Sequence, residues 1–342
     1  MQNDTHSTDK DFWILALSGG GYRGLFTATV LQEMEKRCGV PLAKKFDLIA
    51  GTSVGSILAA ALAKEIPADR LPKLFQEHGK TIFHGWWKQW PLLKMLNLGF
   101  FSARYSANGL NSVLSRDDLL GNAIFNALEH RLMIPAVNLS KGSAQFFKTQ
   151  HCADYHYDGS VPLKDAVIAS AAAPTFFPVH RFNQNRYADG GLVANSPALV
   201  AFHEAVHKLG IPPDRVHVIS IGTMNKSVTM DPRSPLDIGL ITGGGWRFWK
   251  GWRQRVFEVT LAAQEQLSED MLKHVLKDKV LRIDVPLEPD QTAVVSIDSV
   301  TDAANEVLEG QAREAAKKEL TGPTYDRWMS HTASPAQFFN RG

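Results

Sequence analysis

The stretch FDLIAGTSVGSILAAALA, residues 46–63, contains the pattern that decides the fold. Its apolar start predicts a buried strand, the run Gly51-Thr52-Ser53-Val54-Gly55 follows directly, and the apolar residues 56–63 predict a helix. Because a strand-to-helix turn is sharp, glycines on both sides of Ser53 let other backbone approach closely. A G-x-S-x-G run in this context is typical of a nucleophile elbow. We therefore expect Ser53 to act as a nucleophile.

Strand and helix patterns alternate along the rest of the chain. The apolar residues 12–17 predict a buried strand that ends at Ser18-Gly19-Gly20-Gly21, and a helix follows from near Tyr22 to about Arg37. Further strands are expected at residues 146–149, 216–221 and 280–285, and further helices at 163–172, 197–209 and 257–276. This alternation predicts a three-layer α/β/α architecture with a largely parallel central sheet. Beyond Gly222 the sequence predicts a mainly helical C-terminal extension packed on the same core.

The composition is that of an ordinary globular protein. The 342 residues are 44% apolar and 21% charged, with a net charge of +2, so global charge gives no reason to expect a DNA or RNA partner. Two cysteines, Cys38 and Cys152, form neither a disulfide framework nor a metal site, and we expect reduced thiols. Residues 1–11 carry no apolar leader, and no run of eighteen apolar residues exists. We expect a cytoplasmic protein.

The glycine loop allows two interpretations. Residues 19–24 satisfy G-x-G-x-x-G, a pattern of dinucleotide-binding folds, and a non-catalytic nucleotide-binding module is one reading. That reading requires an acidic residue after the second strand, whereas Asp47 lies at the start of this strand. Successive amides in a glycine-rich turn before a helix also bind anions, which favours an oxyanion hole.

The proton acceptor for Ser53 is open on sequence grounds. Asp189 lies in the run Arg186-Tyr187-Ala188-Asp189-Gly190-Gly191, where we expect a turn outside any helix or strand. The alternative is a Ser-Asp-His triad, the chain order of α/β-hydrolases. Its candidate histidines lie downstream of Asp189: His203, His207 and His217.

Taken together, these motifs resemble the patatin-like phospholipase family. The matching segments are Ser18-Gly19-Gly20-Gly21-Tyr22-Arg23-Gly24, Gly51-Thr52-Ser53-Val54-Gly55, residues 170–178, Asp189-Gly190-Gly191 and Asn195-Ser196-Pro197. The likeness runs from about residue 14 to residue 202, with an echo at 219–223, and three ordered motifs are far more specific than one. The resemblance implies a phospholipase domain at residues 14–205, with the remaining core strand and the helical extension at 206–342. Ser18 stands where many members carry Asp, outside the glycines.

The resemblance also implies the roles of the site residues. Ser53 would be the nucleophile and Asp189 the general base of a Ser-Asp dyad without histidine. The amides of Gly20 and Gly21, with Gly19 and Arg23 nearby, would bind the oxyanion. Four glycines would frame the elbow and the base: Gly51, Gly55, Gly190 and Gly191. Because an ordinary Asp has a pKa of about 3.9, burial would have to raise its basicity. This chemistry needs no metal or other cofactor.

Two further expectations concern partners. Tryptophans gather with lysine and arginine at residues 86–90 and 246–253, a composition that suits a bilayer interface, so we expect contact with a phospholipid membrane surface and peripheral association with its inner face. The compact organisation with a helical extension is similar to bacterial antiphage phospholipase effectors. That likeness implies activation by a cyclic dinucleotide from a partner cyclase, with contributions from residues 105–110 and 247–255. Among partners we also expect a second copy of the chain, in a homo-oligomer.

Overall fold

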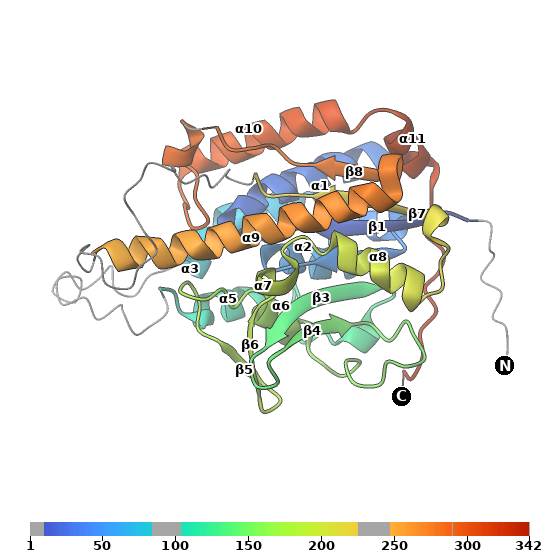
Figure 1. The fold of residues 1–342 in the computed structure, drawn as a ribbon, viewed down its shortest axis with the longest axis horizontal. Helices are drawn as coiled ribbons and strands as arrows, with labels where there is room; N and C mark the ends of the chain where they lie inside the picture. Colours follow the sequence, from blue (N-terminus) through green and yellow to red (C-terminus); the bar gives the residue numbers. More distant parts are fainter. Residues whose placement is uncertain (1–9, 84–103, 225–246, 289, 342) are drawn as a thin grey trace.

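The computed structural model describes residues 10–83, 104–224, 247–288 and 290–341, with the side chains of the third range from residue 258 onward. Its strands form one eight-stranded sheet in the order β5-β6-β3-β2-β1-β7-β8, with β4 paired to β3 (Figure 1). The strands are β1 (Phe12–Leu17), β2 (Leu48–Gly51), β3 (Leu132–Asn138), β4 (Ser143–Lys148), β5 (His180–Phe182), β6 (Asn185–Asp189), β7 (Val216–Ile221) and β8 (Val280–Ile283).

The centre of the sheet is parallel. Strand β1 pairs in parallel with β2 and β7, while β2–β3 and β7–β8 are also parallel; the pairs β3–β4, β3–β6 and β5–β6 are antiparallel. Carboxyl ends of parallel strands meet at one edge of a sheet, which is where α/β folds place their sites. The segments that follow β1 and β2, beginning at Ser18 and Thr52, therefore leave the sheet side by side.

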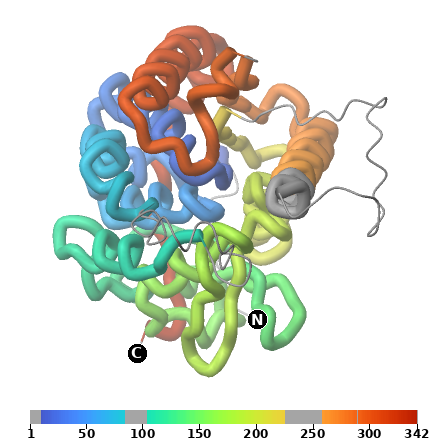
Figure 2. The backbone as a smooth tube through the Cα atoms, turned by 90° about the vertical axis from the view of Figure 1, so that its left-hand side faces the viewer, coloured from blue at the N-terminus to red at the C-terminus, as the bar shows by residue number. Residues whose placement is uncertain are grey.

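Helices cover both faces of the sheet, as the alternating side chains of β1 show. Trp13, Leu15 and Leu17 pack into one core cluster, whereas Phe12, Ile14 and Ala16 belong to the cluster on the opposite face. Since successive side chains of a strand point to opposite faces, both faces must be covered. The expected three-layer α/β/α fold is confirmed (Figures 1 and 2).

The described α-helices are α1 (Gly24–Cys38), α2 (Val54–Ala63), α3 (Arg70–Ile82), α5 (Ala107–Leu114), α6 (Leu163–Ser170), α7 (Gly191–Ala194), α8 (Ala198–His207), α9 (Arg247–Leu276), α10 (Asp302–Glu319) and α11 (Pro323–Ser330). The first core cluster includes residues of α1, α2, α6 and α10, and the second includes residues of α8 and α9. Figure 1 shows α10 beside α1, and the long α9 beside α8 and β8.

The structure differs from the sequence-based expectations at several elements. The helix expected at residues 257–276 is the second part of the thirty-residue α9. Strands β3, β5 and β6 were not predicted, because β3 contains Pro135 and the other two are short and polar. Asp189, expected in a turn, is instead the last residue of β6, and the turn begins at Gly190.

Candidate active site

Ser53 lies at the turn between β2 and α2, in a strained backbone conformation. Its φ is 54° and its ψ is −122°, a region that residues with a side chain rarely adopt and that costs about 1–3 kcal/mol. A Cβ on Gly51 would lie 2.1 Å from the Gly55 carbonyl oxygen, and one on Gly55 would lie 2.2 Å from the Leu17 carbonyl oxygen. The two glycines therefore permit the sharp turn that lifts the serine hydroxyl out of the sheet edge.

Asp189 approaches Ser53 from the end of β6. The Ser53 hydroxyl donates a hydrogen bond to Asp189 Oδ2 at 2.7 Å, and the Gly191 amide donates to Asp189 Oδ1 at 2.6 Å. A Cβ on Gly190 would lie 2.2 Å from the Pro135 carbonyl oxygen, so only glycine allows β6 to turn there against β3. These contacts bring together two side chains that are 136 positions apart in the chain.

The environment of Asp189 makes it a stronger base than an ordinary aspartate. The residue is only 3% exposed, and burial raises the pKa of its carboxyl from 3.8 to about 6, against the opposing hydrogen bonds from Ser53 and Gly191. A carboxylate with a pKa near 6 remains mostly ionised at neutral pH, yet accepts a proton more readily than one in water. The geometry and the burial thus favour proton transfer from the Ser53 hydroxyl.

The glycine loop lies beside this pair. Gly20 and Gly21 line the same pocket as Ser53, and no acceptor for either amide occurs in the described part of the chain. Gly21 has a φ of +61°, and a Cβ on Gly20 would lie 2.1 Å from Thr223 Oγ1, so the loop needs glycine at both positions. Two available amides before the N-terminus of α1 form an arrangement suited to an anionic oxygen.

Gly19 and Arg23 have other partners than those expected. The Gly19 amide donates to the Asn195 carbonyl oxygen at 3.0 Å, which removes it from the set of available donors. The Arg23 guanidinium is buried and donates to the carbonyl oxygens of Gly20 and Met224, at 3.4 and 3.0 Å. Both residues therefore hold the loop in place and do not supply donors to the pocket.

The pocket that contains Ser53 and Asp189 is lined mainly by apolar side chains. They come from α2, α3, α5, the segment after α6, α9 and the loop before α10. The apolar lining residues are Val54, Ile57, Phe75, Ile82, Phe83, Leu110, Ala171, Ala173, Phe176, Phe177, Leu261 and Ile297. Such a lining excludes water and fits a hydrocarbon chain rather than a charged ligand.

Two polar residues beside the pair were not singled out by sequence reasoning. Ser170 accepts a hydrogen bond from the Ser53 amide at 2.9 Å, and its carbonyl oxygen accepts one from the Gly190 amide at 3.0 Å. Asn195 lines the pocket and accepts the Gly19 amide. Both residues occur in segments that carry the family resemblance. No local sequence pattern, however, indicated that Ser170 or Asn195 would hydrogen-bond to another loop of the site.

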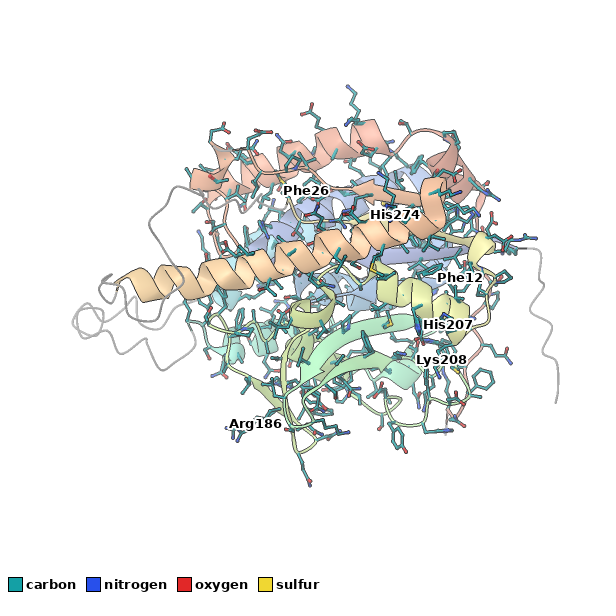
Figure 3. All side chains as sticks on the ribbon, viewed as in Figure 1. Phe12, Phe26, Arg186, His207, Lys208 and His274 are labelled. Carbon is teal, nitrogen blue, oxygen red and sulfur yellow. The ribbon has the colours of Figure 1, made fainter. Side chains whose placement is uncertain are left out.

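The three histidines considered for a triad lie elsewhere. His203 and His207 are on α8 with their rings 4.4 Å apart, and His207 ends that helix (Figure 3). His217 is buried in β7, where its ring stacks on Trp13 at 4.5 Å and Nε2 lies 3.6 Å from Asp11. None of the three is among the described residues that line the pocket, which disfavours the triad alternative.

The residues expected to contact a membrane or a nucleotide are only partly described. The tryptophans at positions 86, 87, 90 and 246 lie outside the described residues, as do the side chains of 247–257. Tyr105 is described: its hydroxyl donates to Asp298 Oδ2 at 2.6 Å, and Arg104 forms an ion pair with the same carboxylate at 2.5 Å. Leu110 lines the apolar pocket.

Among the described helices, none combines the length and the apolar character that crossing a bilayer requires. Within the same residues, no three side chains of His, Cys, Asp or Glu gather in a way that could hold a metal ion.

Comparisons with known proteins show which proteins this chain is similar to. The sequence profile described as "Patatin-like phospholipase" matches residues 15–202. A protein of Pseudomonas aeruginosa (strain BWHPSA011 / Pa011) named "cGAMP-activated phospholipase" is 40% identical over 96% of this chain and 95% of its own. One of Escherichia coli (strain TW11681) with the same name is 30% identical over 99% and 98%. An Escherichia coli protein named "cUMP-AMP-activated phospholipase" is 26% identical over 79% and 81%.

The fold and the site define an α/β/α protein with a serine on a strained elbow, beside a buried carboxylate and an apolar pocket. The chain belongs to the patatin-like phospholipase family. The resemblance suggested by the sequence motifs is therefore confirmed, and with it the fold class and the enzyme class, a serine-dependent lipid acyl hydrolase.

Proposed function

We propose that this chain is a phospholipase that cleaves acyl esters of membrane glycerophospholipids with a Ser53–Asp189 dyad and is activated by a cyclic dinucleotide. The observation that carries the proposal is the 2.7 Å hydrogen bond from Ser53 Oγ to a carboxylate of raised pKa at the edge of an apolar pocket. Ser53 Oγ attacks the ester carbonyl carbon while its proton moves to Asp189 Oδ2. The tetrahedral oxyanion is held by the amides of Gly20 and Gly21.

The intermediate collapses when the ester bond breaks, and Asp189 returns the proton to the leaving alcohol of the glycerol backbone. Water then attacks the acyl-Ser53 ester, with Asp189 again accepting a proton, and the fatty acid is released. One carboxylate thus serves both half-reactions, and the cycle requires no metal or cofactor. The apolar lining supports an acyl chain as the group that occupies the pocket.

The activator is proposed from the relatives. Three proteins that match along most of their length are named for activation by cGAMP or by cUMP-AMP. A cyclic dinucleotide made by a partner cyclase would thus switch this enzyme on, at the inner face of the membrane and in antiphage defence. Restraint of this kind is expected on functional grounds, because an always-active lipase would degrade the membranes of its own cell. Assembly into a homo-oligomer is part of the proposal.

The test uses the full chain and phosphatidylglycerol–phosphatidylethanolamine liposomes. Fatty acid release is measured for wild type and Ser53→Ala, each without nucleotide, with cGAMP and with cUMP-AMP. We expect release by wild type with one of the two nucleotides only, and none by Ser53→Ala. Equal release with and without each nucleotide would contradict gating, and release by Ser53→Ala would contradict the nucleophile.

A second test separates the dyad from the triad esterase. Substitution of each histidine by Ala should leave most of the activity, because none of them lines the pocket among the described residues. A fluorophosphonate should label Ser53 in wild type, which a nucleotide-binding module without an activated serine would not permit. The histidine variants are His203→Ala, His207→Ala and His217→Ala.

A further inference from the structure

Several side chains of helix α9 contact the loops of the active site, among them Gln264 and the buried carboxylate of Glu265, which is 3% exposed. Its Oε1 accepts a hydrogen bond from the Ser18 hydroxyl at 2.9 Å, and its Oε2 accepts one from Asn195 Nδ2 at 2.6 Å. Ser18 begins the glycine loop after β1, and Asn195 directly follows α7, the short helix that begins two residues after Asp189. One side chain therefore contacts both segments that frame the proposed reaction.

Asn195 lies between these two segments and contacts both of them. Its carbonyl oxygen accepts the Gly19 amide at 3.0 Å. Its Oδ1 would lie 2.6 Å from a Cβ on Gly19 and 3.0 Å from one on Gly191, so the amide group is packed between the two turns. The orientation of this amide depends on the acceptor of Nδ2, which is Glu265, because the next contact, to the Gly19 carbonyl oxygen, is 3.5 Å long.

An ion cluster centred on Arg282 holds Glu265 in place. Arg282 on β8 donates to Glu265 Oε1 at 2.6 Å, to Glu269 at 2.9 Å and to Asp284 at 2.6 Å. Glu265 and Glu269 lie one turn apart on α9, a spacing at which like charges repel unless a cation lies between them. All these charged residues lie outside the segment 15–202 that matches the family profile.

From these contacts we infer that Glu265 is a positioning residue: it fixes the distance between the amides of Gly20 and Gly21 and the Ser53–Asp189 pair. This inference rests on the proposed function of that pair. Glu265 is not among the described residues that line the pocket, and its carboxylate acts through Asn195 and Ser18. An acyl hydrolase needs both elements aligned on one carbonyl group, and a displacement of about 1 Å costs about 100-fold in rate.

Glu265→Gln tests the inference, because an amide cannot replace the carboxylate on both sides. The variant offers one acceptor and one donor, whereas Arg282, Ser18 and Asn195 all donate to Glu265. The amide oxygen will face Arg282, and the amide nitrogen will then oppose Asn195 Nδ2, donor against donor. We expect kcat to fall about 10- to 100-fold while KM changes less than about threefold.

Glu269→Gln is the matched control. It removes the same charge from the same helix one turn away, and it replaces an ion pair with the same partner, Arg282, by a neutral hydrogen bond. The described contacts of Glu269 are with Arg282, Ser196 and Ser220, none of which belongs to the glycine loop. We expect a similar loss of thermal stability in the two variants, and a kcat for Glu269→Gln within about threefold of wild type.

Activity is measured as fatty acid release at saturating nucleotide, normalised to the fraction of Ser53 that a fluorophosphonate labels, so that unfolded protein does not count. If Glu265→Gln does not fold, Ser18→Ala decides. It removes the hydroxyl that bonds to both Glu265 and Arg282 and leaves every charge in place, and we expect a fall of about 3- to 10-fold in kcat. Wild-type kcat in the deciding variant, or an equal fall in Glu269→Gln, overturns the positioning role. Activity in Ser53→Ala overturns the proposed function as well.

Discussion

Replacing Asp189 with Asn should abolish hydrolysis and at the same time stabilise the folded protein at alkaline pH. Burial raises the pKa of this carboxyl from 3.8 to about 6. At about 1.4 kcal/mol per pH unit, that difference corresponds to roughly 3 kcal/mol by which the ionised carboxylate destabilises the folded state. A neutral side chain of the same shape avoids this cost.

The pH dependence follows from the sign of the shift. The folded state binds the proton more tightly than the unfolded state, so the contribution to stability is fully present below about pH 3.8 and is lost as the pH rises through about 6. Wild type carries the whole penalty at pH 8 and about half of it at pH 5. The Asn oxygen can still accept from the Gly191 amide and its nitrogen can donate to Ser53 Oγ, so both hydrogen bonds remain.

The measurement is urea-induced unfolding of wild type and Asp189→Asn at pH 8 and pH 5, followed by tryptophan fluorescence. We expect the variant to be up to roughly 3 kcal/mol more stable at pH 8, and about half as much more stable at pH 5. Asp189→Ala is the control, since it removes the charge and both hydrogen bonds, and its gain should be smaller. An Asp189→Asn protein no more stable than wild type at pH 8 would refute the account of a buried carboxylate with a raised pKa.

Three further outcomes are expected. The kcat/KM of wild type on a soluble fluorogenic ester should be flat above about pH 7 and fall about tenfold by pH 5, since Asp189 must be ionised and its pKa is about 6; an unchanged rate at pH 5 would contradict this. Gly20→Ala should lower kcat by about 100-fold or more, because the added Cβ would lie 2.1 Å from Thr223 Oγ1 and would displace the glycine loop. A wild-type kcat in this variant would count against the proposed oxyanion hole. Gly310→Ala on the exposed surface of α10 should raise stability by about 0.5–1 kcal/mol at unchanged activity, as no described atom lies within 4 Å of the new Cβ; a lower unfolding midpoint would reject it.

Local patterns in the sequence predicted the elements that carry a strong hydrophobic signal. The apolar runs that became β1, β2 and β7 and the small-residue helix α2 were recognisable because every position in them is buried. The glycines around Ser53 marked the elbow, since a turn that tight leaves no room for a Cβ. The polar strand β6 left no such signal, so Asp189 was expected in a turn rather than at a strand end.

Only the tertiary structure shows which candidate base lies beside Ser53. The residues by themselves left the Asp189 route and the Ser-Asp-His route about even, because distance along the chain says nothing about which side chain a sheet edge brings to a serine. Strand β6 pairs with β3, β3 with β2, and that order places Asp189 2.7 Å from Ser53 Oγ. The raised pKa of Asp189 likewise arises from burial among segments distant in sequence.

The sequence by itself therefore determined the fold class, the nucleophile candidate and the glycine loop, since each depends on short-range patterns of size and hydrophobicity. Only the folded chain decided that the Gly19 amide is already bonded to Asn195 and that Glu265, on a helix beyond the family profile, contacts the loops of the site. Such contacts join residues far apart in sequence, and hydrogen-bond partners of that kind depend on packing that no local pattern encodes.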